Sequence, residues 1–429
     1  MPHHMSRRRF LGASAALAAP LFVPARALGR NGAVAPSARI VMGAIGLNGM
    51  GTSDLRSFLG CPEAMVVAVC DVDRAHRLRA RRLVEDFYGR TETSGAWQGC
   101  RDYNDFREVV ARTDLDAVLI ATPDHWHVPI ALAAVQAGKD VYCEKPISRT
   151  VREGRILADA VARHGRILQV GSQLRSTRNV RHACELVRNG RIGRLHAIHT
   201  FLPFGPTSPL RAPEPVPEGL DYEMWLGPAP WAPYTTDRCH YSFRWISDYS
   251  GGNLTDLGAH DNDIAQWGHG SEYSGPIEVE GEGEFPPDGL FNTATRFQLR
   301  YRYADGVELI CSTARVQGVR FQGSEGWVYV RSAIDAEPKS LLTTVIGPGE
   351  VHLYDSPHHQ QNFLDCVKSR RQPIAPVEVG HRSITICHIG NICLKLGRKL
   401  RWDPEREEFP GDDEANRLLA APMRAPWNV

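Results

Sequence analysis

The sequence predicts an α/β protein of two domains, the first built on a parallel sheet between layers of helices and the second on a large, mostly antiparallel sheet. Three observations lead to this prediction. At 429 residues the chain is longer than one average domain. From Ala38 onward short apolar runs alternate with helical stretches, and later strand-like segments alternate apolar with polar residues. We therefore expect residues 38–165 to form the first domain and residues 166–429 to form the second.

Four apolar runs are the predicted strands of the first domain, and each is apolar along most of its length. They are RIVMGAI (39–45), AMVVAVCD (64–71), LDAVLIATP (115–123) and DVYCEKP (140–146). Continuously apolar strands separated by helices are typical of a parallel sheet that is covered on both faces.

A glycine-rich turn, GLNGMG, follows the first strand directly and precedes a helical stretch. Glycines in this context let the backbone turn tightly, so that its amides and the helix N-terminus can meet a pyrophosphate. The sequence thus predicts a Rossmann dinucleotide-binding domain. The turn residues expected to bind the cofactor are Gly46, Asn48, Gly49, Met50 and Gly51.

Asp71 ends the second strand about 20 residues after the turn, where a carboxylate would accept hydrogen bonds from the adenosine ribose. This favours NAD as the cofactor, although Arg74 leaves NADP open. The turn departs from the usual G-x-G-x-x-G pattern because Asn48 stands at the middle glycine. Asparagine tolerates left-handed backbone conformations, so we expect the turn to form.

The second domain shows a different strand pattern. RLHAIHTFLP (194–203), TRFQLRYRYADGVELICST (295–313) and RFQGSEGWVYVR (320–331) alternate apolar with polar residues and include hairpin signals such as Asp305-Gly306. These segments predict the antiparallel sheet. The Pro-rich run at 202–219 is predicted to be a long surface loop that borders the active site.

The segment NLTDLGAHDND (253–263) raises a question about function. Read as a helix, it places Asp256 and His260 on one face, together with the apolar Ile264 and Trp267. A pair at this spacing is usually a local hydrogen bond or a charge pairing at a helix N-terminus. The alternative is that the two polar side chains line a cleft and carry chemistry.

Three motifs follow the glycine-rich turn in a specific order: ATPDHWH (121–127), CEKP (143–146) and DLGAHDND (256–263). Together they resemble the Gfo/Idh/MocA family of oxidoreductases. The resemblance runs from about Ala38 to the end of the chain, and it includes GSQLRS (171–176), MWLGPAPW (224–231), EVGHR (378–382) and APW (425–427). It implies a Rossmann domain and a C-terminal α/β domain whose sheet often mediates oligomer contacts, so that a homodimer or homotetramer is expected.

The resemblance also implies three catalytic residues, which are Lys145, Asp256 and His260. His260 would take the proton from a substrate hydroxyl as a hydride leaves the carbon for the nicotinamide. Asp256 would bind and orient a sugar, and Lys145 would hold the hydroxyl and help to carry the proton. The inward face of the 253–263 helix would then line a cleft rather than a core.

Further cofactor contacts are expected around the same motifs, at Thr122, Pro123, His125, His127, Glu144 and Lys145. His125 and His127 follow a strand at the rim where doubly wound sheets bind ligands. We expect them to contact the nicotinamide ribose or the substrate. Their spacing is not diagnostic of a metal centre, so the sequence predicts no metal site.

Five residues are candidates to line a sugar pocket, because aromatic faces and bidentate groups suit polyhydroxylated ligands. They are Gln173, Arg175, Trp225, Arg244 and Trp245. The alternative for each is packing or a surface ion pair.

The N-terminus predicts export. SRRRFLG (6–12), followed by a short apolar run that ends near Ala25-Arg26-Ala27, is typical of a twin-arginine signal peptide over residues 1–27. A basic N-terminal segment without that role is the alternative. The apolar run is too short for a membrane span, so we expect a periplasmic or otherwise exported protein with no membrane partner.

The composition bears on two further points, which are nucleic-acid binding and disulfide bonds. A net charge of +1 gives no electrostatic case for nucleic acid. Ten cysteines without a C-x-x-C pair favour free thiols, although one or two disulfides stay open.

Three functions remain open at this stage. Export favours a tightly held NAD(H) that is restored in each cycle, as in sugar–sugar oxidoreduction or oxidative glycoside cleavage, whose second base could be a tyrosine such as Tyr249. The second is a plain NAD-dependent sugar dehydrogenase, and the third is a carbohydrate-binding protein without activity on the same fold.

Overall fold

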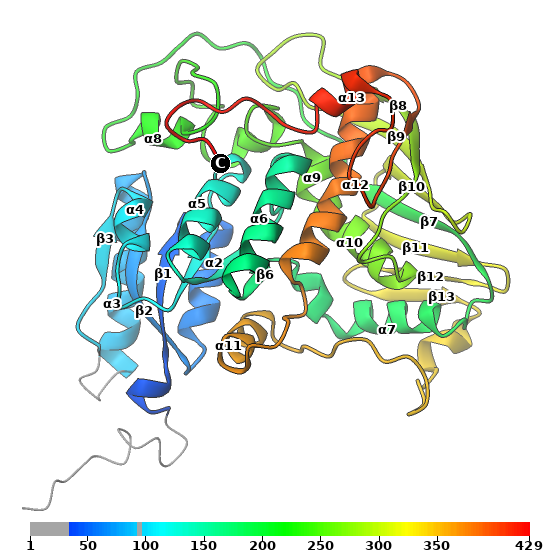
Figure 1. Cartoon of the computed structure of the whole chain (residues 1–429), viewed down its shortest axis with the longest axis horizontal. Coiled ribbons are helices and arrows are strands. Elements are labelled where there is room, and N and C mark those ends of the chain that lie inside the picture. The colour runs from blue at the N-terminus through cyan, green and yellow to red at the C-terminus, as the bar shows by residue number, and fades with distance from the viewer. Residues whose placement is uncertain (1–33, 92–96) are drawn as a thin grey trace, which may run out of the picture.

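The computed structural model describes residues 34–91 and 97–429, and it places two sheets side by side with helices between and around them (Figure 1). The first is a parallel six-stranded sheet in the order β3-β2-β1-β4-β5-β6. Its strands are β1 (Ile40–Ile45), β2 (Ala64–Cys70), β3 (Arg101–Tyr103), β4 (Ala117–Ile120), β5 (Asp140–Cys143) and β6 (Leu168–Val170). The predicted parallel sheet is confirmed, while β6 lies just beyond the boundary drawn at residue 165.

Helices cover both faces of this sheet, as the uninterrupted apolar strands require. They are α2 (Met50–Leu59), α3 (Arg74–Thr91), α4 (Phe106–Val110), α5 (Asp124–Gln136) and α6 (Val151–His164). Every residue of β2, β4 and β5 is buried. Because these strands are parallel, the carboxyl ends of β1, β2 and β4 meet at one edge of the sheet. The glycine-rich turn and the ATPDHWH motif follow the strands at this edge.

The second sheet has eight strands in the order β13-β12-β11-β7-β10-β9-β8-β14, and only β7 and β10 pair in parallel. Its strands are β7 (Leu195–Leu202), β8 (Glu278–Glu284), β9 (Arg296–Arg302), β10 (Glu308–Thr313), β11 (Gly318–Gly323), β12 (Trp327–Val330), β13 (Ile334–Glu337) and β14 (Leu400–Arg401). Along β9 buried and exposed residues alternate strictly. One face of the sheet thus packs on helices and the other faces outward, as the alternating pattern predicts.

Three helices pack on the buried face of the second sheet and join it to the first domain (Figure 1). They are α7 (Arg178–Arg188), α10 (Gly258–His269) and α12 (Val377–Leu396). Helix α12 contacts both α10 and α6, so it bridges the two domains. The segment predicted as one helix over 253–263 is split into α9 (Asn253–Asp256) and α10, with Leu257 between them in helical conformation.

The C-terminal region packs back on the first domain. Helix α11 (His359–Ser369) contacts α2, and its Phe363 and Leu364 are buried in the same apolar cluster as β1. Near the chain end, Trp427 packs against Trp126 and Phe106. These contacts hold the far end of the chain beside the cofactor domain.

A long connection crosses from the second sheet to the first domain, and we call residues 203–249 the strap. It contains α8 (Tyr222–Leu226) and the 3₁₀ helix η4 (His240–Trp245). The strap is tied to the first domain by backbone hydrogen bonds from Arg74 to Gly219 and from Asp221 to Val72. The predicted long loop at 202–219 is irregular over residues 203–217.

All ten cysteines are buried free thiols in this structure, which agrees with the expectation drawn from their spacing. Within the described ranges, no helix combines the length and apolarity needed to cross a bilayer. The predicted signal peptide, residues 1–27, lies outside the described residues.

Arg175 anchors helix α10 through an ion pair with Asp263, and its replacement tests how this helix is held. Its guanidinium forms a bidentate ion pair with Asp263 at 2.6 and 2.8 Å, bonds Glu272 at 2.6 Å, and lies 4.9 Å from the Trp267 ring. Because Arg175 is 2% exposed, its loss would leave Asp263 buried and unpaired. We expect Arg175→Ala to cost about 3–5 kcal/mol and to lower Tm by at least about 5 °C in thermal denaturation.

Arg300→Ala is the matched control, because Arg300 is half exposed and its pairing with Glu308 is a 3.6 Å surface contact. Its expected effect is below about 1 kcal/mol. Equal Tm shifts in the two variants would contradict the anchoring role.

Candidate active site

The glycine-rich turn after β1 has the geometry of a phosphate cradle. Gly46 and Gly49 adopt φ values of 82° and 48°, which glycine tolerates best. A Cβ atom at Gly46 would lie 2.6 Å from the backbone nitrogen of Thr122, and one at Gly51 would overlap the carbonyl oxygen of Gly46. The turn therefore needs glycine at these positions, which leaves room for a group bound against the N-terminus of α2.

Asn48 does not adopt the left-handed backbone conformation that was expected for it. It is not among the residues with positive φ, and its side chain is exposed. The left-handed conformations belong to Gly46 and Gly49, so the expected role for the conformational tolerance of asparagine was wrong. Asn48 and Met50 both line the cavity beside the turn.

Asp71 follows β2 and holds the turn in place. Its Oδ2 accepts a hydrogen bond from the amide of Leu47 at 2.7 Å, and its Oδ1 accepts one from the amide of Asp73 at 2.9 Å. The carboxylate also lines the cavity. It thus stands where a ribose diol would lie beside the pyrophosphate site.

One open cavity runs from the glycine-rich turn, past Asp71, to the strap. The first domain contributes its floor and the strap contributes its roof. Residues from the turn and from the ends of β2, β4 and β5 include Gly46, Leu47, Asn48, Gly49, Met50, Asp71, Thr122, Pro123, Asp124, His127, Glu144 and Lys145. Those from the strap and beyond include Met224, Trp225, His240, Tyr241, Phe243, Arg244 and Asp256.

An ion pair between the two domains lines this cavity. Lys145 Nζ donates to Asp256 Oδ1 at 2.6 Å and to the Asp256 carbonyl oxygen at 2.9 Å. Arg244 Nε lies 3.3 Å from Asp256 Oδ2. Burial acts to raise the pKa of Asp256, but Lys145 and Arg244 outweigh it and hold that pKa below its usual value. Asp256 is therefore an ionised carboxylate flanked by two cations.

His260 lies on the same helical face but is not among the residues that line the cavity. Its Nδ1 is buried without a hydrogen-bond partner in the described part of the chain. Burial and then Lys145 lower its pKa well below the ordinary value, so the imidazole is neutral. Asp256 pairs with Lys145 and Arg244, and the described residues contain no hydrogen bond between Asp256 and His260.

Asp124, the first residue of α5, is a second carboxyl in the cavity. It is buried and accepts a hydrogen bond from Ser250 Oγ at 2.5 Å. Burial raises its pKa to about 7, and the negative charge of Asp256 contributes to the increase. Asp124 belongs to the ATPDHWH motif, but its burial near another acid cannot be predicted from the motif, so no role was expected for it.

The two histidines of ATPDHWH have different positions. His127 lines the cavity and its ring nitrogens lie 2.7 and 2.8 Å from the carbonyl oxygens of Pro146 and Thr122. His125 is 1% exposed, sits 3.0 Å from the Trp225 carbonyl oxygen through Nε2, and does not line the cavity. The expected direct contact of His125 with a ligand is therefore corrected to a supporting position beneath Trp225.

Glu144 lines the cavity, and Gln173 supports it from behind. Gln173 Nε2 donates to Glu144 Oε1 at 2.5 Å and to the Tyr142 hydroxyl at 3.2 Å, and it is absent from the cavity lining. Burial and then Asp54 raise the pKa of Glu144 well above its usual value. The expected sugar contact of Gln173 is corrected to a contact that positions Glu144.

The remaining candidates for sugar contacts divide in the same way. Trp225 and Arg244 line the cavity. Arg175 is buried in its ion pairs beneath α10, and Trp245 donates from Nε1 to Asn253 Oδ1 at 3.3 Å and packs on Phe291. Neither of these two lines the cavity, so packing and ion pairing, the alternative considered for them, is what the structure shows.

The strap also contributes His240, Tyr241 and Phe243 to the cavity. None of the three was predicted from the sequence. They lie beside the quoted Arg244, so their position next to a candidate contact was the one available signal. Tyr249, considered as a second base, is fully buried, accepts a hydrogen bond from Arg238 at 3.1 Å and does not line the cavity.

Comparison with known proteins identifies the family. Residues 40–172 match the NAD-binding Rossmann fold of an oxidoreductase family, and residues 205–429 match the C-terminal alpha/beta domain of the same family. The chain belongs to the Gfo/Idh/MocA family. The resemblance stated from its motifs is thus confirmed, and NAD is the cofactor of its first domain.

Two relatives in this family have names that describe different reactions. An alpha-N-acetylgalactosaminidase of Shewanella oneidensis is 28% identical over 209 residues, which are 45% of this chain and 45% of that protein. Myo-inositol 2-dehydrogenase of Thermotoga maritima is 25% identical over 384 residues, covering 84% of this chain and 98% of that protein. The chain therefore matches less than half the length of the glycosidase relative.

A solved structure shows the same fold. The WlbA dehydrogenase of Bordetella pertussis, in complex with NADH and UDP-GlcNAcA, has a TM-score of 0.62 at 17% identity and covers 85% of this chain and 99% of its own. That likeness supports the two-domain arrangement.

The glycine-rich turn gives a direct test of the cofactor site. Gly51→Ala places a methyl group on the Gly46 carbonyl oxygen, so the turn must shift and NAD binding is expected to fall at least about tenfold. Isothermal titration with NAD measures this change.

Gly89→Ala is the control, because Gly89 lies in α3 with open space around its Cβ position. It is expected to keep NAD affinity and to gain up to about 1 kcal/mol of stability. NAD affinity unchanged in Gly51→Ala would contradict the assignment of the cradle.

Proposed function

We propose that this chain is an enzyme that oxidises a ring hydroxyl of a sugar or glycoside and restores its tightly held NAD(H) within each cycle. The observation that carries the proposal is the Lys145–Asp256 pair at 2.6 Å in the same cavity as the phosphate cradle and Asp71. Two relatives with sugar-related names, the galactosaminidase and the inositol dehydrogenase, support a carbohydrate substrate.

The cavity residues divide the work of binding and proton transfer. NAD, when bound, accepts a hydride from the sugar carbon and returns it later. Lys145 donates a hydrogen bond to the reacting hydroxyl and relays its proton. Asp256 keeps Lys145 in place and, together with Arg244, binds neighbouring hydroxyl groups.

His260 enters the proposal as the final proton acceptor behind Lys145. Its lowered pKa keeps the imidazole neutral, and Lys145 is close enough to be the largest charged contributor to that lowering. Because His260 does not line the cavity, we assign the direct hydroxyl contact to Lys145. His127 and Glu144 shape the wall beside it.

Oxidative glycoside cleavage needs a second base, since oxidation at one carbon acidifies the neighbouring C–H before the leaving group departs. We assign this role to Asp124, which replaces Tyr249 in the proposal. Asp124 lines the cavity and has a pKa of about 7, so it can take and return a proton near neutral pH. This group favours the glycosidase over sugar–sugar oxidoreduction.

A plain NAD-dependent dehydrogenase is the second candidate. The inositol dehydrogenase relative, which matches this chain over 84% of its length, favours it. Export through the twin-arginine route and assembly into a dimer or tetramer remain part of the proposal, and export favours a cofactor that is carried along rather than exchanged.

The first experiment denatures protein purified without added cofactor and quantifies the released nucleotide per chain. We expect about one NAD(H) per chain, with cleavage of p-nitrophenyl glycosides, α-N-acetylgalactosaminide included, and no net NADH. An empty protein that reduces added NAD with a free sugar is a dehydrogenase. A protein that binds no nucleotide would leave only the carbohydrate-binding function.

The second test concerns Asp124 and pH. A base must be ionised, so kcat/KM is expected to rise with pH and to level off above about 7. Asp124→Asn should lower kcat by at least about 100-fold and remove this limb from the pH profile.

Stability separates a catalytic from a structural effect in the same variant. A raised carboxyl pKa means that folding stability is lost as the pH rises through that value, so Asp124→Asn should be no less stable than the parent above pH 7. Ser250→Ala removes a hydrogen bond that lowers the pKa and should move the limb to higher pH. A pH limb unchanged in both variants would exclude Asp124 as the base.

A further inference from the structure

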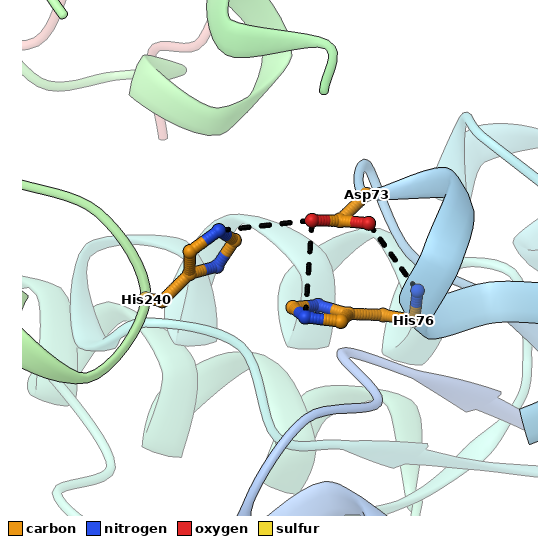
Figure 2. A group of neighbouring side chains, drawn as sticks. All are labelled: Asp73, His76 and His240. Atoms are coloured by element: carbon orange, nitrogen blue, oxygen red, sulfur yellow. Dashed lines mark hydrogen bonds and ion pairs between the residues drawn. The ribbon is translucent and has the colours of Figure 1, made fainter. Parts of the chain in front are cut away.

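Three side chains with metal-binding chemistry meet at the edge of the cavity (Figure 2). Asp73 Oδ2 lies 3.6 Å from His240 Nε2 and 3.8 Å from His76 Nε2. Ligand atoms of the three residues all lie within 4.8 Å of one another. Figure 2 shows the carboxylate facing both imidazole rings, so the three groups converge on one point.

The cluster joins two parts of the molecule that are distant in sequence. Asp73 and His76 lie at the start of α3, in the NAD-binding domain, and His240 begins η4 in the strap. The Asp73 carboxylate is already oriented, because its Oδ1 accepts hydrogen bonds from the amides of Ala75 and His76. Its Oδ2 is left to face the two rings.

The spacing suits a small transition-metal ion. Zn²⁺ binds imidazole nitrogen and carboxylate oxygen at about 2.0–2.2 Å, so two ligand atoms in a tetrahedral site lie about 3.3–3.5 Å apart. The separations of 3.6 and 3.8 Å need to close by only a few tenths of an ångström. Two imidazoles and one carboxylate are a donor set that favours such an ion over Mg²⁺ or Ca²⁺.

A second carboxylate supports this arrangement from behind. Asp71 Oδ1 lies 3.7 Å from His76 Nδ1, on the side of the ring away from Asp73. Metal-binding histidines usually donate their other ring N–H to a carboxylate, which fixes the tautomer.

We propose that Asp73, His76 and His240 bind one Zn²⁺-like divalent transition-metal ion, which ties the strap to the NAD-binding domain beside Asp71. This departs from the expectation that the chain has no metal site, which was drawn from the spacing of His125 and His127 with Asp261 and Asp263. The ion would brace the wall of the cavity at its adenosine end, away from Lys145. The proposal does not rest on the sugar chemistry, because metal binding is measured directly.

The test uses the full chain, free of tags and stripped with a chelator, and equilibrium dialysis against ZnCl₂. We expect one zinc per chain. His240→Asn keeps a residue that tolerates the φ of 55° at this position and removes the imidazole, while Asp73→Asn keeps the capping oxygen and removes the charge. Each should weaken zinc binding by more than the roughly 10- to 100-fold typical of losing a supporting residue.

Two controls separate this site from other binding. His164→Ala removes an exposed histidine at the end of α6 and should leave affinity unchanged. A His3→Ala/His4→Ala variant removes the histidines near the N-terminus and should also leave it unchanged. Absence of zinc binding, or zinc binding that survives both His240→Asn and Asp73→Asn, would overturn the proposal.

A second measurement tests the tie itself. Arg211 is half exposed in the strap and is a site for trypsin. Zinc should slow cleavage there in the parent and in His164→Ala, and should not slow it in His240→Asn. Equal cleavage rates with and without zinc in the parent would contradict the bracing role.

Discussion

The ion pair of Lys145 and Asp256 is the interaction on which the rest of the site depends. Lys145 follows a strand of the NAD-binding domain and Asp256 ends α9, which contacts α10 and α12, so the pair exists only when the two domains are docked. Helix α12 secures that docking by contacting both α6 and α10. The position of the chemistry is therefore set by interdomain packing rather than by any single motif.

The same pair explains how neighbouring carboxyls acquire opposite properties. Asp256, between Lys145 and Arg244, has a lowered pKa, whereas Asp124, buried and near that negative charge, has a pKa raised to about 7. Two carboxyl groups with diverging pKa values in one cavity are the usual arrangement for separate binding and acid–base roles. The difference arises because two cations flank Asp256, whereas burial dominates at Asp124 and outweighs the Ser250 hydrogen bond that lowers its pKa.

The sequence predicted those parts of the fold and site in which residue type and local position determine the outcome. Continuous apolar strands and glycines that admit no Cβ led to the parallel sheet and the cradle, and Lys145 and Asp256 were found through their motifs. The predicted sugar contacts of Arg175 and Gln173 were wrong, because the sequence does not show whether an arginine or an amide side chain faces a ligand or a buried carboxylate. Only the packing of η3 (Gln173–Ser176) beneath α10 distinguishes these roles.

The strap is the part that local reasoning could least predict, and it closes the site. An irregular segment carries little periodic signal, yet its α8 and η4 bring Trp225 and Arg244 over the floor built by the first domain. Its backbone is tied at Val72 and Arg74, next to Asp71, which lines the cavity. One segment thus reaches both the Asp71 side of the cavity and the Lys145–Asp256 pair, so a change in how it is held at one end is expected to alter the shape of the other. The shape of the cavity accordingly depends on the strap and its ties as well as on the sheet and the glycine-rich turn.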